Sequence, residues 1–516
     1  MGGGAKENDG RGARRQRLRR LTWIVGILGS VALLLFVLVL QDKDDNQHGS
    51  KGGRLRQLHH KGMRLLHDHE NKLTSQFGWL TGDKRGGGGQ NVAHQEMTPS
   101  EVLEAIVQAK LHLVDIRVNH NALPRSSNNN NNNEKRIDYE GSILGEFCRL
   151  QWSVHKAEPS KNPMFRELLA ASPDCDAGNR VTMDLQQAAR AARDYDDKSQ
   201  HTWDGTDIPK LLNLTTVVFH ESRCGSTLIA NMAVAAGTTD ASGAGAHRVY
   251  SESPPPVAAL KHVCGEEYET CSPEVAATVF QDVIYLMSRS DDPHEQRVFF
   301  KMQSISSRNI DVFQQAFPKT PWLFVYRDPV QVLMSQLAYG PHRANCVAPQ
   351  GRSRQFHLVQ DIVNRVAVFN GEEKPSVQHI PHEDYCAVHL ASITESAVQA
   401  VQSASSVSSS ALAIPVNYND LPRIFYDDIL PGLLGIPHLP PAQYARVQAV
   451  SSQYSKGSGG RAGTFQGDSD KKNQLASEAV KRAAQRYLQA SFDALEQAAQ
   501  AAKQKLSAMR RSTPQQ

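Results

Sequence analysis

Residues 215–230 read Thr-Thr-Val-Val-Phe-His-Glu-Ser-Arg-Cys-Gly-Ser-Thr-Leu-Ile-Ala, and this stretch decides the fold of the chain. An apolar strand from Val217 to Phe219 runs into a tight loop around Gly225 and then into a predicted helix. This order brings free backbone N–H groups and the positive end of a helix dipole to one place. The stretch therefore predicts a cradle for a phosphate group.

The cradle differs from the common nucleotide-binding motif G-x-x-x-x-G-K-[ST]. His220 stands where the first glycine belongs, and Ser226 replaces the lysine that reaches the terminal phosphates. The basic residue is Arg223, two positions before Gly225. The sequence thus favours anion binding without the hydrolysis of a magnesium nucleotide.

A second motif, residues 321–335, reads Pro-Trp-Leu-Phe-Val-Tyr-Arg-Asp-Pro-Val-Gln-Val-Leu-Met-Ser. It is an apolar strand that ends in Arg327-Asp-Pro, with Ser335 eight residues after the arginine. The two motifs together resemble the sulfotransferase family. In that family Lys or Arg precedes Ser-Gly-Thr-Thr in the 5′-phosphosulfate loop, and Arg-Asp-Pro with a later serine binds the 3′-phosphate. The resemblance covers roughly residues 137–500 and is specific only near 215–335.

The resemblance implies a three-layer α/β fold like that of P-loop NTPases, with a central parallel sheet and flanking helices. It implies 3′-phosphoadenosine 5′-phosphosulfate as the sulfonate donor and no metal in the chemical step. Arg327 and Ser335 would bind the 3′-phosphate, because a guanidinium can hold phosphate with two hydrogen bonds. The alternative is a structural ion pair between Arg327 and Asp328. The residues assigned to the 5′-phosphosulfate are Arg223, Cys224, Gly225, Ser226 and Thr227. The alternative for Arg223 is a surface cation.

The general base is predicted less directly. Glu252 follows a predicted strand, and the proline-rich residues 251–256 would form a rigid turn at the carboxyl edge of the sheet, where ligands bind. Some Golgi sulfotransferases have a glutamate in a similar place, which makes Glu252 the first choice. The alternative is an exposed loop carboxylate or the partner of a helix N-cap. His220 and Glu221 are reserves, although a lone histidine that ends a strand is more often a packing residue. Lys301 either stabilises the sulfonate or the acceptor, or extends from the sheet edge into solvent.

A late glycine-rich segment contains the cations Lys456 and Arg461. Family members close the donor site with a late basic loop, so these two residues would contact phosphate; the alternative is an ordinary flexible loop. Residues 418–421, Tyr-Asn-Asp-Leu, resemble a structural Tyr-Glu-Asp-Leu stretch of the family. Cys224, Ser226 and Leu228 depart from the common loop sequence, which suggests an unusual branch with a distinctive acceptor.

Four apolar runs without alternation predict parallel strands covered on both faces, at 215–219, 247–250, 297–301 and 322–326. The segments 275–287 and 310–317 suit helices, and a long C-terminal helix is expected over 480–495. The tract 402–412, rich in Ser and Ala, is predicted to be a loop. Thr98-Pro-Ser-Glu101 has a capping-box pattern, and apolar residues at helical spacing follow it as far as Val114. This helix either belongs to a stem or packs on the domain.

The N-terminus predicts a membrane anchor. Six arginines among residues 11–20 precede the uncharged run Leu21–Leu40, which is long enough to span a hydrocarbon core of about 30 Å. No cleavage pattern typical of a signal peptide follows. The positive-inside rule then predicts a type II signal-anchor protein, with a cytosolic tail at 1–20 and the rest luminal. Residues 41–136 would be a stem that includes the asparagine tract 128–133, and 137–509 a luminal sulfotransferase-like domain with its core at 210–345.

Charge and cysteine content agree with this organisation. The formal net charge of +4 is too balanced to imply binding of nucleic acid over the whole molecule. Seven cysteines would lie in an oxidising compartment. Cys224 is expected to be unpaired, and six remain for three bridges among fifteen pairings, with Cys264–Cys271 as the most local pair. Asn213-Leu-Thr forms a glycosylation sequon, which is unfavourable if its strand is buried.

The sequence therefore predicts a Golgi membrane sulfotransferase that transfers a sulfonate directly, in line, to a hydroxyl of a glycan or secreted protein. A nucleotide-dependent kinase and an inactive luminal binding protein of the same fold are the alternatives. Sugar or tyrosine as acceptor, and the oligomeric state, are left open.

Overall fold

The computed structural model describes residues 97–124, 137–176, 178–199, 209–238, 245–265, 271–338, 346, 356–406, 412–436, 438–453 and 467–512. The chain divides into two compact units, Met1–His94 and Gln95–Gln516, and all described residues belong to the second. The predicted membrane anchor and the asparagine tract lie outside the described residues. Among the helices that are described, none combines the length and the apolar character needed to cross a membrane.

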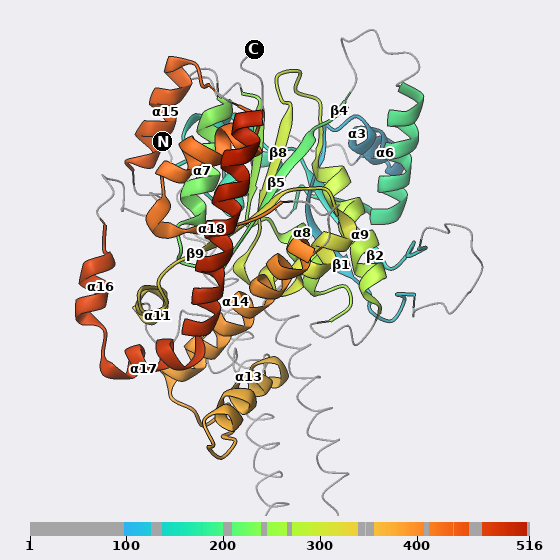
Figure 1. Ribbon diagram of the computed structural model, residues 1–516. Coiled ribbons are helices and arrows are strands. Elements are labelled where there is room, and N and C mark those ends of the chain that lie inside the picture. Colours follow the sequence, from blue (N-terminus) through green and yellow to red (C-terminus); the bar gives the residue numbers. More distant parts are fainter. Residues whose placement is uncertain are drawn as a thin grey trace, which may run out of the picture. The chain divides into compact units, whose positions relative to one another are not determined.

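A five-stranded parallel sheet forms the centre of the second unit (Figure 1). Its strands lie in the order β10-β9-β5-β8-β6, and every neighbouring pair is parallel. Their bounds are β5 Asn213–His220, β6 His247–Ser251, β8 Arg297–Lys301, β9 Trp322–Tyr326 and β10 Ala413–Asn417. The α/β architecture and all four predicted strands are confirmed.

Both faces of the sheet are buried, as the apolar runs predicted. Along β9, Trp322 and Phe324 enter one hydrophobic core, while Leu323 and Val325 enter the other. The first core is completed by α8 Pro254–Lys261, α9 Pro273–Met287, α10 Ile310–Ala316 and α14 His382–Ser406. The second is completed by α7 Ser226–Gly237, the π-helical segment Phe425–Leu433 and α15 Pro441–Ser451. The predicted helices at 275–287 and 310–317 are confirmed.

The C-terminal region differs from the single helix predicted over 480–495. Two helices, α17 Glu478–Tyr487 and α18 Gln489–Ser512, meet around Leu488. α17 packs into a third core with α11 Pro329–Leu337, α13 Phe356–Phe369 and α14, whereas α18 contributes to the two cores beside the sheet. The tract predicted to be a loop at 402–412 is also partly helical, because α14 continues to Ser406.

A smaller antiparallel sheet precedes the central one in sequence. The capping box of Thr98 and Glu101 opens α3 Pro99–Val107 as predicted. The helix then ends, and the residues through Val114, expected to be helical, instead begin β1 His112–Val118. β1 pairs with β2 Ile143–Cys148, which pairs with β3 Val181–Asp184. Since β2 lies in the predicted luminal domain, α3 and β1 belong to that domain and not to a stem. The remaining elements here are α4 Trp152–Ala157, α5 Phe165–Ala170 and α6 Leu185–Ser199.

Three disulfides join Cys148 to Cys175, Cys264 to Cys271 and Cys346 to Cys386. The predicted pair Cys264–Cys271 is therefore confirmed. Cys224 is free and buried, as expected, and burial raises the pKa of its thiol to about 12. Asn213 of the sequon is exposed at the start of β5.

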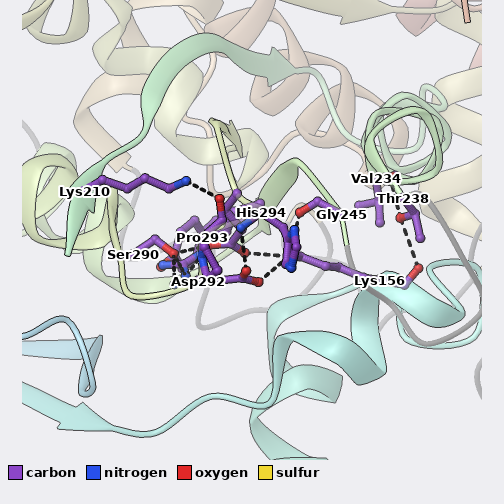
Figure 2. Close-up of polar contacts among 12 residues, drawn as sticks. Lys156, Lys210, Val234, Thr238, Gly245, Ser290, Asp292, Pro293 and His294 are labelled. Atoms are coloured by element: carbon purple, nitrogen blue, oxygen red, sulfur yellow. Dashed lines mark hydrogen bonds and ion pairs between the residues drawn. The ribbon is translucent and has the colours of Figure 1, made fainter. Parts of the chain in front are cut away.

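A cluster of buried charges lies before the first residues of β6 and β8, at the amino edge of the sheet (Figure 2). Lys156 of α4 donates to the carbonyl oxygen of Gly245 at 3.0 Å and pairs with Glu295 at 2.7 Å and with Asp292 at 3.6 Å. Arg248 pairs with Glu295 from the other side at 2.5 Å. Although burial opposes it, these two cations lower the pKa of Glu295 to about 2. The cluster ties α4 to the central sheet.

Candidate functional site

The two sequence motifs meet at the carboxyl edge of the sheet. β5 and β9 are neighbours, and His220 pairs with Val325, so the loops that follow the two strands lie side by side. The backbone N–H of Glu221 and the thiol of Cys224 donate to the carbonyl oxygen of Val325, at 3.2 and 3.0 Å. The carboxyl edge is where open parallel sheets bind ligands.

The loop between β5 and α7 has the backbone of a tight cradle. Ser222, Arg223 and Gly225 have φ values of 76°, 57° and 87°. Left-handed backbone at two residues other than glycine costs about 1–3 kcal/mol each and is found most often where a ligand is held. Ser226 and Thr227 open α7 and are buried, so their N–H groups belong to the first helical turn beside Arg223.

One aromatic ring contacts both motifs. Tyr418 directly follows β10, and a Cβ atom on Gly225 would lie only 2.6 Å from its Cδ2 atom. The guanidinium carbon of Arg327 stands over the same ring, 4.1 Å from its centroid. Tyr418 therefore lies between the cradle and Arg327, and glycine at 225 is what lets the ring approach the loop.

Arg327 is buried at the end of β9 and has several partners. Its Nε donates to Gln331 at 2.7 Å, and its Nη2 donates to Asp468 at 2.8 Å and to the Ser469 hydroxyl at 2.9 Å. Asp328 accepts from the backbone N–H of Gln331 at 3.0 Å and caps α11. The carboxylate that pairs with Arg327 is thus Asp468, and the alternative pairing with Asp328 is not observed.

Ser335 lies two turns along α11 from the cap. It is buried, and its hydroxyl donates to the carbonyl oxygen of Gln331 at 2.9 Å. Gln331 therefore contacts both residues that the sequence assigned to the 3′-phosphate. Arg327 precedes α11 and Ser335 lies two turns along it, and Gln331 links the two.

Sequence reasoning missed Lys472 and Asp468, which sit beside Arg327. Lys472, on α16 Ser469–Leu475, pairs with Asp468 at 2.7 Å. Burial lowers the pKa of Lys472, and the positive charges of Arg327 and Arg223 lower it further, against the raising effect of Asp468. The arginines of both motifs thus act on Lys472. In the sequence, Asp468 and Lys472 are marked only by their i, i+4 spacing just after the glycine-rich segment. Lys456 and Arg461 of that segment lie outside the described residues.

Glu252, Lys301 and His220, the three candidate catalytic residues, are brought together on neighbouring strands. Glu252 directly follows β6 with φ 60°, and its backbone N–H donates to the carbonyl oxygen of Lys301 at 2.7 Å. Its carboxylate forms an ion pair with the ammonium group of Lys301, whose side chain is only 1% exposed, against 27% for Glu252. His220 Nε2 lies 3.9 Å from the same carboxylate. Glu252 is the more accessible member of the pair.

The turn expected after Glu252 is in fact the beginning of a helix. Pro254 is the first residue of α8, and Ser253 occupies the N-cap position. Proline is well suited to the first helical turn, where its missing N–H has no helical partner to lose. Glu252 is therefore fixed between the end of a strand and the start of a helix.

His220 and Glu221 have well-defined structural partners. The backbone N–H of Ser222 donates to His220 Nδ1 at 3.0 Å, which leaves the ring proton on Nε2, 2.9 Å from the Met302 carbonyl oxygen. Glu221 is buried and accepts from the Arg327 backbone N–H at 2.5 Å. Burial raises the pKa of Glu221 well above its usual value, although this hydrogen bond and the Arg327 charge act in the opposite direction. Both side chains hold the loop rather than face solvent.

Comparison with known proteins finds no family model that matches the chain, and no curated protein sequence matches it. Within the part of the chain that the structure describes, no three His, Cys, Asp or Glu side chains form a group able to hold a metal ion. The case for function therefore depends on the geometry of the carboxyl edge.

Proposed function

We propose that this protein is a sulfotransferase with the fold of that family, and that it takes its sulfonate from 3′-phosphoadenosine 5′-phosphosulfate. The observation that carries the proposal is the shared contact with Tyr418, because Gly225 and Arg327 come from separate motifs and lie against one ring. Arginines of both motifs also act electrostatically on Lys472. Two anion-binding elements that meet in this way suit a ligand with phosphate at both ends.

The residues at this edge fit such a donor. Arg223 and the backbone N–H groups of residues 224–227 would hold the 5′-phosphosulfate, and Arg327, Ser335 and Lys472 would hold the 3′-phosphate. Tyr418 lies so close to Gly225 that a Cβ atom at this position of the loop has no room. The bound donor would supply a sulfonate joined to a phosphate oxygen that leaves with the electron pair of the broken S–O bond.

Glu252 and Lys301 would carry out proton transfer and charge stabilisation, respectively. The Glu252 carboxylate accepts the proton of the acceptor hydroxyl as the oxygen forms its bond to sulfur. The Lys301 ammonium pairs with this carboxylate and stabilises negative charge near the breaking bond. His220 donates to the Met302 carbonyl oxygen and so positions the end of β5. It therefore acts as a positioning residue, not as the base.

The proposed location is the Golgi membrane, with a type II anchor at 21–40 and a luminal catalytic domain. The three disulfides support a domain that folds in an oxidising compartment. The proposed acceptor is a hydroxyl of a glycan or secreted protein. A kinase is disfavoured because Ser226 stands in place of the phosphate-binding lysine.

The test is calorimetric binding of adenosine 3′,5′-bisphosphate to the full chain, followed by transfer of labelled sulfonate to mixed glycan and peptide acceptors in the presence of a metal chelator. Arg327→Gln should weaken binding by about 1.5–3 kcal/mol, the value of a hydrogen bond to a charged group. Arg289→Gln is the matched control, because Arg289 is equally buried and pairs with Asp196 at 2.6 Å. Equal loss of affinity in both variants would sink the proposal. Binding without transfer would favour an inactive binding protein of the same fold.

A further inference from the structure

A cavity of about 420 Å³ lies beside the turn that carries Glu252. Pro254, two residues after Glu252, lines it, and so does Gln303, whose side-chain Nε2 donates to the Glu252 carbonyl oxygen at 3.3 Å. The opposite wall comes from β1 of the smaller sheet. The cavity therefore lies between the start of α8, next to Glu252, and the N-terminal sheet.

Polar groups line this cavity from both walls. Asp115 of β1 and His120 after it face His262, after the end of α8, and Gln303, after β8. Asp115 is half-buried next to a β-bulge, where the register of β1 against β2 shifts between Leu113 and Asp115. Bulges often redirect a side chain beside an active site. The carboxylate, the two imidazoles and the amide offer several hydrogen bonds to one ligand.

We infer that this cavity binds the acceptor as a sugar ring with several hydroxyl groups, and that β1 supplies its specificity through Asp115 and His120. The inference rests on the proposed sulfotransferase function, since it gives Glu252 its acceptor. The volume is within the range of small-ligand pockets. A tyrosine side chain offers one hydroxyl to these polar groups, whereas a sugar ring offers several that can bond them at the same time. The described residues that line the cavity also include no Phe, Tyr or Trp to stack on a tyrosine ring.

The test measures acceptor binding without any donor, so that it is independent of the phosphate site. Saturation-transfer NMR on the purified full chain would use free galactose, N-acetylglucosamine and N-acetyltyrosine amide as probes. We expect saturation of the protons of at least one sugar, and about tenfold weaker binding in Asp115→Ala. Asp311→Ala is the matched control, because Asp311 is also a carboxylate bonded to the next backbone N–H, and burial raises the pKa of both.

A second pair of variants keeps the test readable if Asp115→Ala does not fold. His120 and His294 are both exposed in loops, so neither His120→Ala nor His294→Ala threatens the core. Weaker sugar binding in the first variant alone supports the inference. Saturation of the tyrosine amide alone, no saturation of any sugar, or equal effects of the two variants would overturn it. Adenosine 3′,5′-bisphosphate binding, measured separately on Asp115→Ala, should be unchanged; this readout reports on the proposed function.

Discussion

Replacing Gly225 by alanine tests the contact on which the site is built. Gly225 has φ +87°, and an added Cβ atom would lie 2.6 Å from Cδ2 and 2.9 Å from Cε2 of Tyr418. The left-handed backbone costs alanine about 1–2 kcal/mol. The overlap with the ring adds about 1–3 kcal/mol, because the ring must move within a packed environment. We therefore expect a loss of about 2–5 kcal/mol in the free energy of unfolding.

Gly371→Ala separates the two contributions. Gly371 has φ +70°, and an added Cβ atom would meet nothing within 4 Å, so only the backbone cost applies. The difference between the variants, measured by urea unfolding, should be about 1–3 kcal/mol. Because Tyr418 also lies under the Arg327 guanidinium, Gly225→Ala should weaken binding of adenosine 3′,5′-bisphosphate roughly fivefold, a cation–π contribution of about 1 kcal/mol. Equal stability of the two variants together with unchanged binding would refute the arrangement.

Four further predictions concern single charged or titratable groups. Asp468→Asn should strengthen bisphosphate binding by about fivefold, since it frees Arg327 from a half-exposed carboxylate worth about 1 kcal/mol; weaker binding would mean that Asp468 orients the cation. Cys224 should resist alkylation at pH 8 until the protein is unfolded, because burial raises its pKa to about 12; rapid labelling of the native protein would contradict this. Glu295→Gln should cost about 3–5 kcal/mol of stability and leave bisphosphate affinity unchanged; a loss of affinity would link the amino edge to the site. Burial lowers the pKa of His389 to about 3, so the unfolded chain takes up this proton first as pH falls below 6.5. As pH falls below 6.5, the free energy of unfolding should therefore decrease more steeply in the unmutated protein than in His389→Gln. The difference in slope should be about 1.4 kcal/mol per pH unit, and equal slopes would contradict the assignment.

The sheet could be predicted because its strands are covered on both faces. A strand such as Trp322–Tyr326 has no polar residue to interrupt it, and such a run in a chain with helical spacers indicates a parallel α/β core. β10 escaped prediction because Pro415 interrupts its short apolar run. The structure places β10 at the end of the sheet, where a strand tolerates a residue without an N–H group. β1 escaped for another reason: its first residues continue the helical spacing of α3, and only pairing with β2 decides their conformation.

Only those site residues that stand inside a continuous sequence motif could be predicted. Arg223 and Arg327 stand inside motifs that combine a strand, a turn and a helix, so the backbone alone puts them at one edge. Tyr418, Asp468 and Lys472 reach that edge through the packing of β10 and α16, which no local pattern reports. The neutral form of His220 was likewise hidden, because it depends on the hydrogen bonds that its two ring nitrogens make in the folded loop.

The two charge clusters of this protein differ in a way that assigns their roles. At the amino edge, two cations, Lys156 and Arg248, face two carboxylates, Asp292 and Glu295, so the charges of the cluster balance. Removing charge from water is costly unless it is balanced, so a neutral buried cluster suits a purely structural role. At the carboxyl edge, the charges of Arg223 and Arg327 both act on Lys472, and Asp468 is a carboxylate that pairs with Arg327 and Lys472. Burial also raises the pKa of nearby Glu221 well above its usual value, which disfavours a further negative charge at this edge. A concentration of positive charge beside a strained loop favours the binding of an anion, which is the physical reason to expect a phosphate-bearing ligand at this edge and not at the other.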